Sequence, residues 1–181
     1  MDYFPFLIIL LLIPMYVFII WALISKNKLE KKILLNADDE IANYPKLARD
    51  IPLVKSYMEN KKVRLAAMAF SNSFVFKFAA DKTMSEYEGF IKCDSFNDSS
   101  NQIVLSQEIN MKTAFNKAKN IITLDDLKTQ KIETREEMHA LIGAIVIFAK
   151  CHLQNVKWIS AVNIEDVSSG RDLEFKITLY K

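Results

Sequence analysis

Glycine, cysteine and histidine are scarce in this chain of 181 residues, which contains three glycines, two cysteines and two histidines. The glycines, Gly89, Gly143 and Gly170, are isolated from one another, so the sequence has no glycine-rich phosphate loop and no nucleophile elbow. Cys93 and Cys151 lie far apart and outside the spacing of zinc or redox motifs. These absences exclude several large classes of enzyme.

The two histidines do not form a metal site either. His139 and His152 are more than three turns apart on one expected helix, so they could not share an ion without other ligands. Cys151 is adjacent to His152, and neighbouring side chains diverge on a helix. We expect ordinary packing here, and the sequence predicts no catalytic residue, no metal ligand and no cofactor.

The chain also lacks a large excess of charge of either sign, because 24 basic residues nearly balance 22 acidic ones and give a formal net charge of +2. Such a chain has no strong field to recruit nucleic acid, so no nucleic-acid partner is expected. Low-complexity tracts and internal repeats are absent as well. The part of the chain after residue 25 has the length of one folded domain.

What the chain does have is a run from Tyr3 to Ile24 without a single charged side chain. About 20 apolar residues are enough to cross a bilayer as one helix. The run predicts a single-pass membrane anchor over residues 3–25. A cleaved signal peptide is the alternative, but the start lacks Lys and Arg, and no small-residue cleavage pattern follows the run.

Four lysines follow the run directly and predict its orientation. Lys26, Lys28, Lys31 and Lys32 are expected to stay in the cytoplasm, which would place the C-terminal domain there too. An exported domain on a signal anchor is the alternative. The same lysines could contact anionic lipid headgroups, at about 1 kcal/mol each near the surface. They are the residues for which the sequence suggests contact with lipid headgroups.

The remainder divides into a polar helical neck, residues 26–49, and a soluble α+β domain, residues 50–181. Asp50 is expected to cap a helix that has Pro52 in its first turn and ends near residue 60. Apolar residues alternate on both sides of Ser71–Asn72–Ser73, which predicts a β-hairpin over residues 63–80, although the first arm could be helical. Three phenylalanines in the second arm would form a row that packs in the core or binds a partner: Phe74, Phe76 and Phe78.

The later segments alternate between strand and helix patterns. Strands are expected over residues 87–93 and 102–106, joined by a polar loop over 94–101, and helices over 111–122 and from 123. Thr134 and Glu137 form a capping-box pattern before a helix over 135–152 that is apolar all round, which is typical of a buried core helix. Two strands, over 156–164 and 173–179, should close the domain as an antiparallel hairpin. The expected fold is α+β, with an antiparallel sheet packed on helices.

Glu174 and Lys176 suggest one catalytic alternative. An E-x-K pair on a strand places both side chains on one face, as a metal-dependent nuclease would need, with Asp94 or Asp166 as a further acid. The simpler interpretation is the solvent face of a terminal strand. The sequence therefore favours a membrane-anchored, non-catalytic domain that binds a protein partner, such as an accessory subunit of an envelope complex or a tethered inhibitor of the immunity-protein type. The nuclease-like enzyme is the rival hypothesis.

Overall fold

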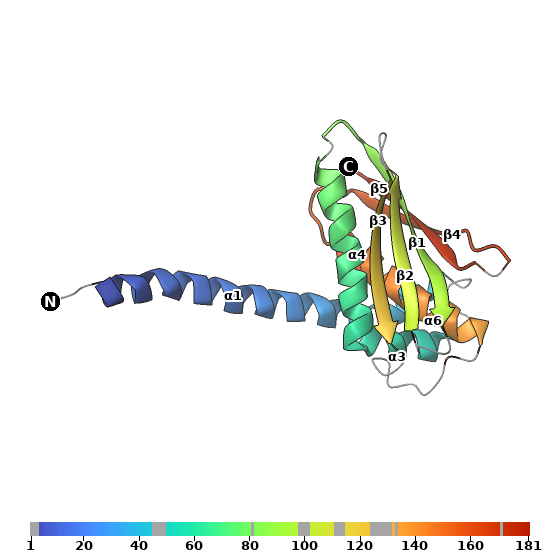
Figure 1. Ribbon diagram of the computed structural model, residues 1–181, viewed down its shortest axis with the longest axis horizontal. Helices are drawn as coiled ribbons and strands as arrows, with labels where there is room; N and C mark the ends of the chain where they lie inside the picture. Colours follow the sequence, from blue (N-terminus) through green and yellow to red (C-terminus); the bar gives the residue numbers. More distant parts are fainter. Residues whose placement is uncertain are drawn as a thin grey trace. The chain divides into compact units, whose positions relative to one another are not determined.

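The computed structural model describes residues 4–44, 50–80, 82–97, 102–110, 115–123, 132, 134–170 and 172–181 (Figure 1). It contains two compact units, Met1–Leu35 and Asn36–Lys181. The first unit is built on one helix, α1 (Phe4–Leu35), which runs through Pro14. Within the described residues, α1 is the one helix that is long and apolar enough to cross a membrane. An anchor and a signal sequence share these properties, so retention of the helix stays a prediction.

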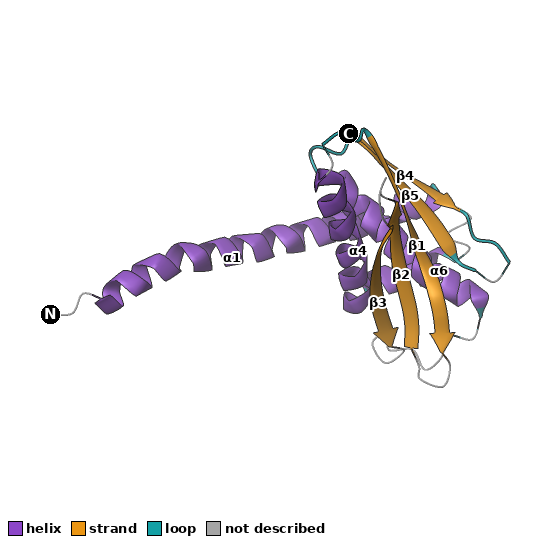
Figure 2. Ribbon diagram, turned by 45° about the horizontal axis from the view of Figure 1, so that its top comes forward, coloured by secondary structure: helices purple, strands orange, loops and turns teal. Residues whose placement is uncertain are grey.

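The second unit is an α+β domain, as predicted. Five antiparallel strands form one sheet in the order β3-β2-β1-β5-β4. The strands are β1 (Glu86–Asn97), β2 (Gln102–Asn110), β3 (Phe115–Thr123), β4 (Ala161–Asp166) and β5 (Glu174–Tyr180). The helices that follow α1 are α2 (Ala37–Ala42), α3 (Ile51–Glu59), α4 (Lys61–Ala80) and α6 (Arg135–Gln154). Figures 1 and 2 show α4 and α6 on the same face of the sheet.

The core lies between this face of the sheet and helix α6. The capping box at its start is confirmed: the Glu137 backbone amide donates to the Thr134 hydroxyl at 3.2 Å, and the Thr134 amide donates to the Glu137 carboxylate at 3.0 Å. From Ala140 to Cys151 every residue of α6 is buried. The prediction of a central core helix is therefore confirmed, because a helix that is apolar on all sides needs cover on all sides.

The helix expected after Asp50 is also confirmed. The Asp50 side chain accepts a hydrogen bond from the Leu53 amide at 3.1 Å, and Pro52 lies in the first turn of α3. The aspartate thus satisfies one of the amides that a helix start leaves without an intrahelical partner. This cap fixes the point at which α3 begins.

The β-hairpin predicted over residues 63–80 is wrong, because this segment is helix α4. Apolar residues occur at every second position of the segment, but many of the positions between them are apolar or small as well. The residues that are buried recur at helical spacing: Val63, Ala66, Ala67, Phe70, Phe74 and Phe78. The supposed turn contains no glycine, and the Ser71 hydroxyl donates to the Met68 carbonyl at 3.0 Å within the helix. Phe74 and Phe78 are fully buried one turn apart, whereas Phe76 is 72% exposed.

The helix predicted over residues 111–122 is wrong as well. Residues 115–123 form β3, which pairs with β2 from Phe115 opposite Asn110 to Thr123 opposite Gln102. An uninterrupted ladder with β2 satisfies the backbone groups on one side of this edge strand, and this tertiary pairing outweighs a marginal helical stripe. Residues 111–114 and 124–131, which include most of the predicted short helix after residue 123, lie outside the described residues.

Several strand boundaries differ from the prediction, and β2 extends to Asn110 rather than to residue 106. β1 continues to Asn97 through a bulge between Cys93 and Ser95, so the first half of the predicted polar loop is strand; residues 98–101 lie outside the described part of the chain. β4 begins at Ala161, because Val156 and Trp158 lie in the turns that follow α6. The antiparallel pairing of β4 with β5 is confirmed.

Gly89 allows the sheet and helix α4 to approach closely. A Cβ atom at this position would lie 2.8 Å from the Phe74 Cζ atom and 2.9 Å from the Glu108 carbonyl oxygen. Both distances are shorter than a carbon atom tolerates, so glycine is required at this point of β1. The Phe74 ring fills the space that a side chain would occupy.

Candidate functional site

The sheet face turned away from α4 and α6 is the candidate site, and we call it the outer face. Residues alternate along each strand, so the buried Tyr87, Ile91, Phe175 and Ile177 point inward and their neighbours point outward. The outer-face residues with described side chains are Glu86, Glu88, Phe90, Lys92 and Asp94 of β1; Val104, Ser106 and Glu108 of β2; Ala161, Asn163 and Glu165 of β4; and Glu174, Lys176, Thr178 and Tyr180 of β5.

Two ion pairs cross the strands of the outer face. Lys176 of β5 pairs with Glu88 of β1, and the Lys92 ammonium of β1 lies 3.0 Å from the Glu108 carboxylate of β2. The hydrogen bond to Glu108 raises the pKa of Lys92, and the bond to Glu88 raises the pKa of Lys176. Both lysines therefore stay charged at neutral pH.

Phe90 lies at the centre of this arrangement. Its register partners are Lys176 on β5 and Glu108 on β2, one member of each ion pair. The ring is neither fully buried nor fully exposed. Aromatic side chains are enriched in protein-binding surfaces, whose rims are polar.

Acidic groups predominate on the half of the outer face formed by β1, β5 and β4. Its acids are Glu86, Glu88, Asp94, Glu165 and Glu174, whereas Lys92 and Lys176 are its basic residues with described side chains. Toward the other edge, β3 places Lys117 and Lys119 opposite Glu108 and Ser106 in the backbone register. The β4–β5–β1 half is therefore negatively charged.

Glu174 and Lys176, the E-x-K pair, lie on the outer face, as the alternation predicts. Of the two acids suggested as further metal ligands, only one lies on the same face. Glu174 is the register partner of Lys92. Asp94 lies on the same side, where the Ser106 hydroxyl donates to its carboxylate at 2.5 Å. Asp166 points to the opposite side of the sheet, where its carboxylate lies 3.2 Å from His139 Nε2. The described residues contain no group of three His, Cys, Asp or Glu side chains placed to hold a metal ion.

His139 and Asp166 join α6 to the end of β4. The His139 ring also meets the Phe175 ring edge-on, at 5.4 Å between centroids. Burial alone would raise the pKa of Asp166, but hydrogen bonds from Ser168 and the neighbouring His139 outweigh it and lower the pKa. The contacts are those of a structural link, which agrees with the packing role that the sequence indicates.

At the other end of α6, Cys151 is buried and His152 is partly buried. The His152 Nδ1 atom lies 2.9 Å from the hydroxyl of Ser71 on α4, and Ser71 is fully buried. Burial raises the pKa of Cys151 to about 12, and nearby Glu40 adds to this, so its thiol stays protonated and unreactive. The Ser71–His152 contact was not predicted, because 81 residues separate the pair in sequence.

A buried ion pair joins α2 to α6 and was also missed from the sequence. The Lys150 ammonium lies 2.5 Å from the Glu40 carboxylate and 4.8 Å from the centre of the Tyr44 ring. Burial alone would lower the pKa of Lys150, but its bonds to Glu40 and Tyr44 outweigh burial and raise it. This pair holds α2 against the core and is not accessible as a binding site.

The four candidate lipid-binding lysines lie on the C-terminal part of α1. Lys28, Lys31 and Lys32 are exposed, and Lys26 forms an ion pair with Glu30 at 3.8 Å, one turn along the helix. They follow the apolar part of α1 without a break in the helix. The arrangement suits contact with headgroups at the end of a membrane span, which stays a prediction.

Comparison of the chain with protein-family models, with curated proteins and with solved structures found no match.

Proposed function

We propose that this protein is a membrane-anchored, non-catalytic interaction module whose outer face binds a protein partner. The observation that carries the proposal is the outer face itself: an open sheet surface with Phe90 at its centre, two ion pairs around it and excess acid on one half. An accessory subunit of an envelope complex or a tethered inhibitor would use such a surface.

The ion pairs support binding more than stability. The side chains of both pairs are partly exposed, and ion pairs near the surface contribute only about 0–1 kcal/mol to folding. They do fix the long side chains of Lys92 and Lys176 in place, and ordered side chains lose less entropy when a partner binds. A face that is already ordered around a central aromatic ring is prepared for docking.

The charge of the face indicates the chemistry of the partner. Complementary potentials speed association and discriminate among partners. The acidic β4–β5–β1 half would therefore meet a surface rich in Lys and Arg. Because exposed charges are screened by salt, binding should weaken as ionic strength rises.

The lysines at the end of α1 support a cytoplasmic position for the domain. We expect a tag placed after Lys181 to resist protease in sealed, right-side-out vesicles. Replacing Lys26, Lys28, Lys31 and Lys32 with Gln, together with a Lys inserted near position 2, should invert some molecules and expose the tag. Replacing Lys61, Lys62, Lys77 and Lys82 with Gln is the matched control and should leave the tag protected. Protease-sensitive tags on the native protein would contradict this orientation.

The binding surface is tested by changing the charge of the outer face. The double variant Glu86→Lys/Glu165→Lys should lose most of the partner that copurifies with the tagged full-length protein from native membranes, and Phe90→Ser should do the same. The double variant Asp39→Lys/Glu59→Lys, an equal charge change at exposed positions on α2 and α3, should retain it. Quantitative mass spectrometry of the purified complexes is the measurement.

Two results would contradict the proposal. One is equal recovery of partner by all three variants and the native protein. The other is cleavage of plasmid DNA that depends on a divalent cation and is abolished by Glu174→Ala, which would favour the nuclease alternative instead.

A further inference from the structure

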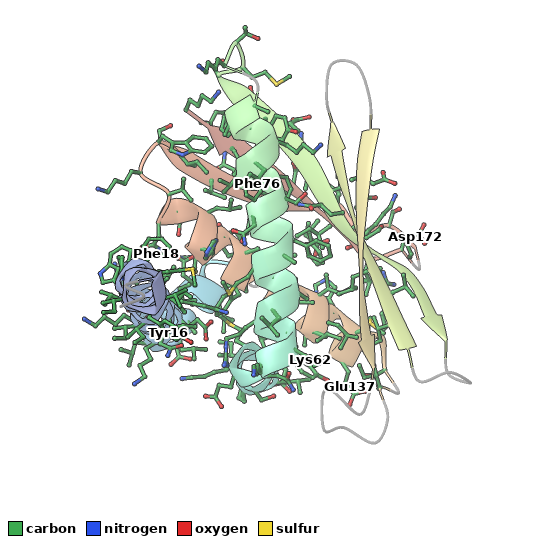
Figure 3. The ribbon with its side chains drawn as sticks, turned by 60° about the vertical axis from the view of Figure 1, so that its left-hand side comes forward. Tyr16, Phe18, Lys62, Phe76, Glu137 and Asp172 are labelled. Atoms are coloured by element: carbon green, nitrogen blue, oxygen red, sulfur yellow. The ribbon has the colours of Figure 1, made fainter. Side chains whose placement is uncertain are left out.

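Helix α4 carries an exposed stripe, which we call the α4 seam: Leu65, Ala69, Asn72, Phe76 and Ala79. The side chains are spaced four, three, four and three residues apart, an average of 3.5, which is the spacing of a coiled-coil seam. All five are exposed, Leu65 at 41% and Phe76 at 72%. Figure 3 shows Phe76 and Lys62 on this helix.

The α4 seam is unusual because charge is absent from it. From Leu65 to Phe76 the helix has no Asp, Glu, Lys or Arg on any side. The opposite side is already buried in the core through Val63, Phe70, Phe74 and Phe78. A helix in a soluble domain normally turns a charged face to water, and an exposed apolar one marks a contact surface.

We propose that the α4 seam is covered by the α4 seam of a second copy of this chain, with the two helices antiparallel. A two-fold axis between Ala69 and Asn72 sets Leu65 of each copy against Phe76 of the other. Ala69 then meets Asn72 across the axis. Small side chains at the centre allow the helices to approach closely, while the two Leu65–Phe76 contacts pack on either side, so the surface is self-complementary.

The charges at the ends of α4 favour the antiparallel arrangement. With the axis at this position, Lys61 of one copy lies opposite Ala80 of the other, so the helices overlap along their full length. Lys61 and Lys62 then lie opposite Ala80 and Ala79 of the second helix, although the C-terminal turn of that helix also carries Lys77. In a parallel pair, these lysines would lie next to their own copies and repel one another.

The α4 seam is separate from the outer face, so this proposal does not depend on the protein partner proposed above. It draws only on anchorage by α1, which would confine all copies to one membrane. Confinement raises the effective concentration of a second copy, so a short interface can suffice. The α4 seam extends from Leu65 to Ala79, which gives about two heptads of contact.

Cysteine crosslinking of the full chain in native membranes tests both the contact and its direction. The background is Cys93→Ser; Cys151 is retained because it is buried and its pKa is raised to about 12. Leu65→Cys and Phe76→Cys chains with different tags should crosslink when they are coexpressed. Ala79→Cys should not crosslink to its own copy, because the two positions would be roughly 25 Å apart along antiparallel helices. A strong Ala79→Cys dimer would show a parallel pair and overturn the proposed arrangement.

A second variant separates pairing through α4 from crowding by the anchor. Ala69→Cys lies near the proposed axis and should crosslink to its own copy; adding Phe76→Asp should reduce the crosslinked fraction at least tenfold. Adding Ile51→Asp, a matched change at an exposed apolar residue on α3, should leave it unchanged. An equal fraction with Phe76→Asp, or no crosslinking at any of these positions, would overturn the proposal. Quenching of a dye at Phe76→Cys by headgroup-labelled lipid would show instead that the membrane covers the α4 seam.

Discussion

The variant Ile145→Asp is expected not to fold. Ile145 lies in the middle of α6, has no exposed surface, and is flanked in the chain by Ala144 and Val146, which are also fully buried. A carboxylate there would lose its hydration in a buried part of the helix whose chain neighbours are apolar. The milder change Ile145→Ala should fold but lower the free energy of unfolding by about 2–5 kcal/mol, the usual cost of a large-to-small change in a core.

Both variants can be followed in the full-length protein in detergent. Limited proteolysis should degrade the domain of Ile145→Asp at once, while the native domain resists. Ile51→Asp is the control, because it introduces the same charge at an exposed position in the first turn of α3, where an acid is tolerated. Native-like resistance of Ile145→Asp would mean that α6 is exposed, and the packing of the whole domain would have to be revised.

The position of α6 could be predicted because several signals in its sequence agree. Thr134 and Glu137 mark the start, the helix has apolar residues on all sides, and the run is too short to be a second membrane span. Local propensity, capping and hydrophobic pattern thus point to one structure. The same agreement holds for Asp50 and Pro52 at the start of α3, and for the alternating residues of β5.

The errors over α4 and β3 have the opposite cause, which is disagreement between local signals. In α4 nearly every residue is apolar or small, so both a period of two and a period of 3.6 fit the sequence. In β3 the decisive interaction is a ladder with β2, whose register no local pattern reveals. Burial of Phe70, Phe74 and Phe78 against the core decides the first segment, and strand pairing decides the second.

The candidate site was predictable only within single strands. Alternation places Glu174 and Lys176 on one face of β5, and the structure agrees. Their cross-strand neighbours were not predictable, because Glu88 is far from Lys176 in sequence and reaches it only through the antiparallel register of β1 and β5. The face on which Asp166 would lie also depended on that register. A bulge at Cys93 and Ser95 further changes the direction of β1, and the sequence gives no clear signal for it.

Loss of the Glu40 carboxylate should destabilise the domain strongly, although Glu40 lies in a helix of only six residues. The Lys150 side chain is 7% exposed and its ammonium bonds to Glu40, of which 22% is exposed. Glu40→Leu would leave a buried ammonium with Tyr44 as its remaining contact, and breaking one side of a buried pair costs about 3–5 kcal/mol. We expect the lower end of this range, because Glu40 is partly hydrated and the released lysine could reach water.

The double variant Glu40→Leu/Lys150→Met tests whether charge imbalance, rather than the loss of a contact, causes this effect. Both charges are then gone and the volumes are similar, so most of the lost stability should return. Urea unfolding followed by the fluorescence of Trp158, in a Trp21→Phe background, measures each variant and the coupling between the two positions. Because the pKa of Lys150 is raised, its contribution is complete at neutral pH and is lost only as pH rises through the raised value, above 10.5. In Glu40→Leu the lowering effect of burial on the pKa of Lys150 is no longer opposed by Glu40, so the cost of the substitution should decrease as pH rises and the buried ammonium loses its proton. A double variant as unstable as Glu40→Leu alone would show that α2 is held by packing and not by the ion pair.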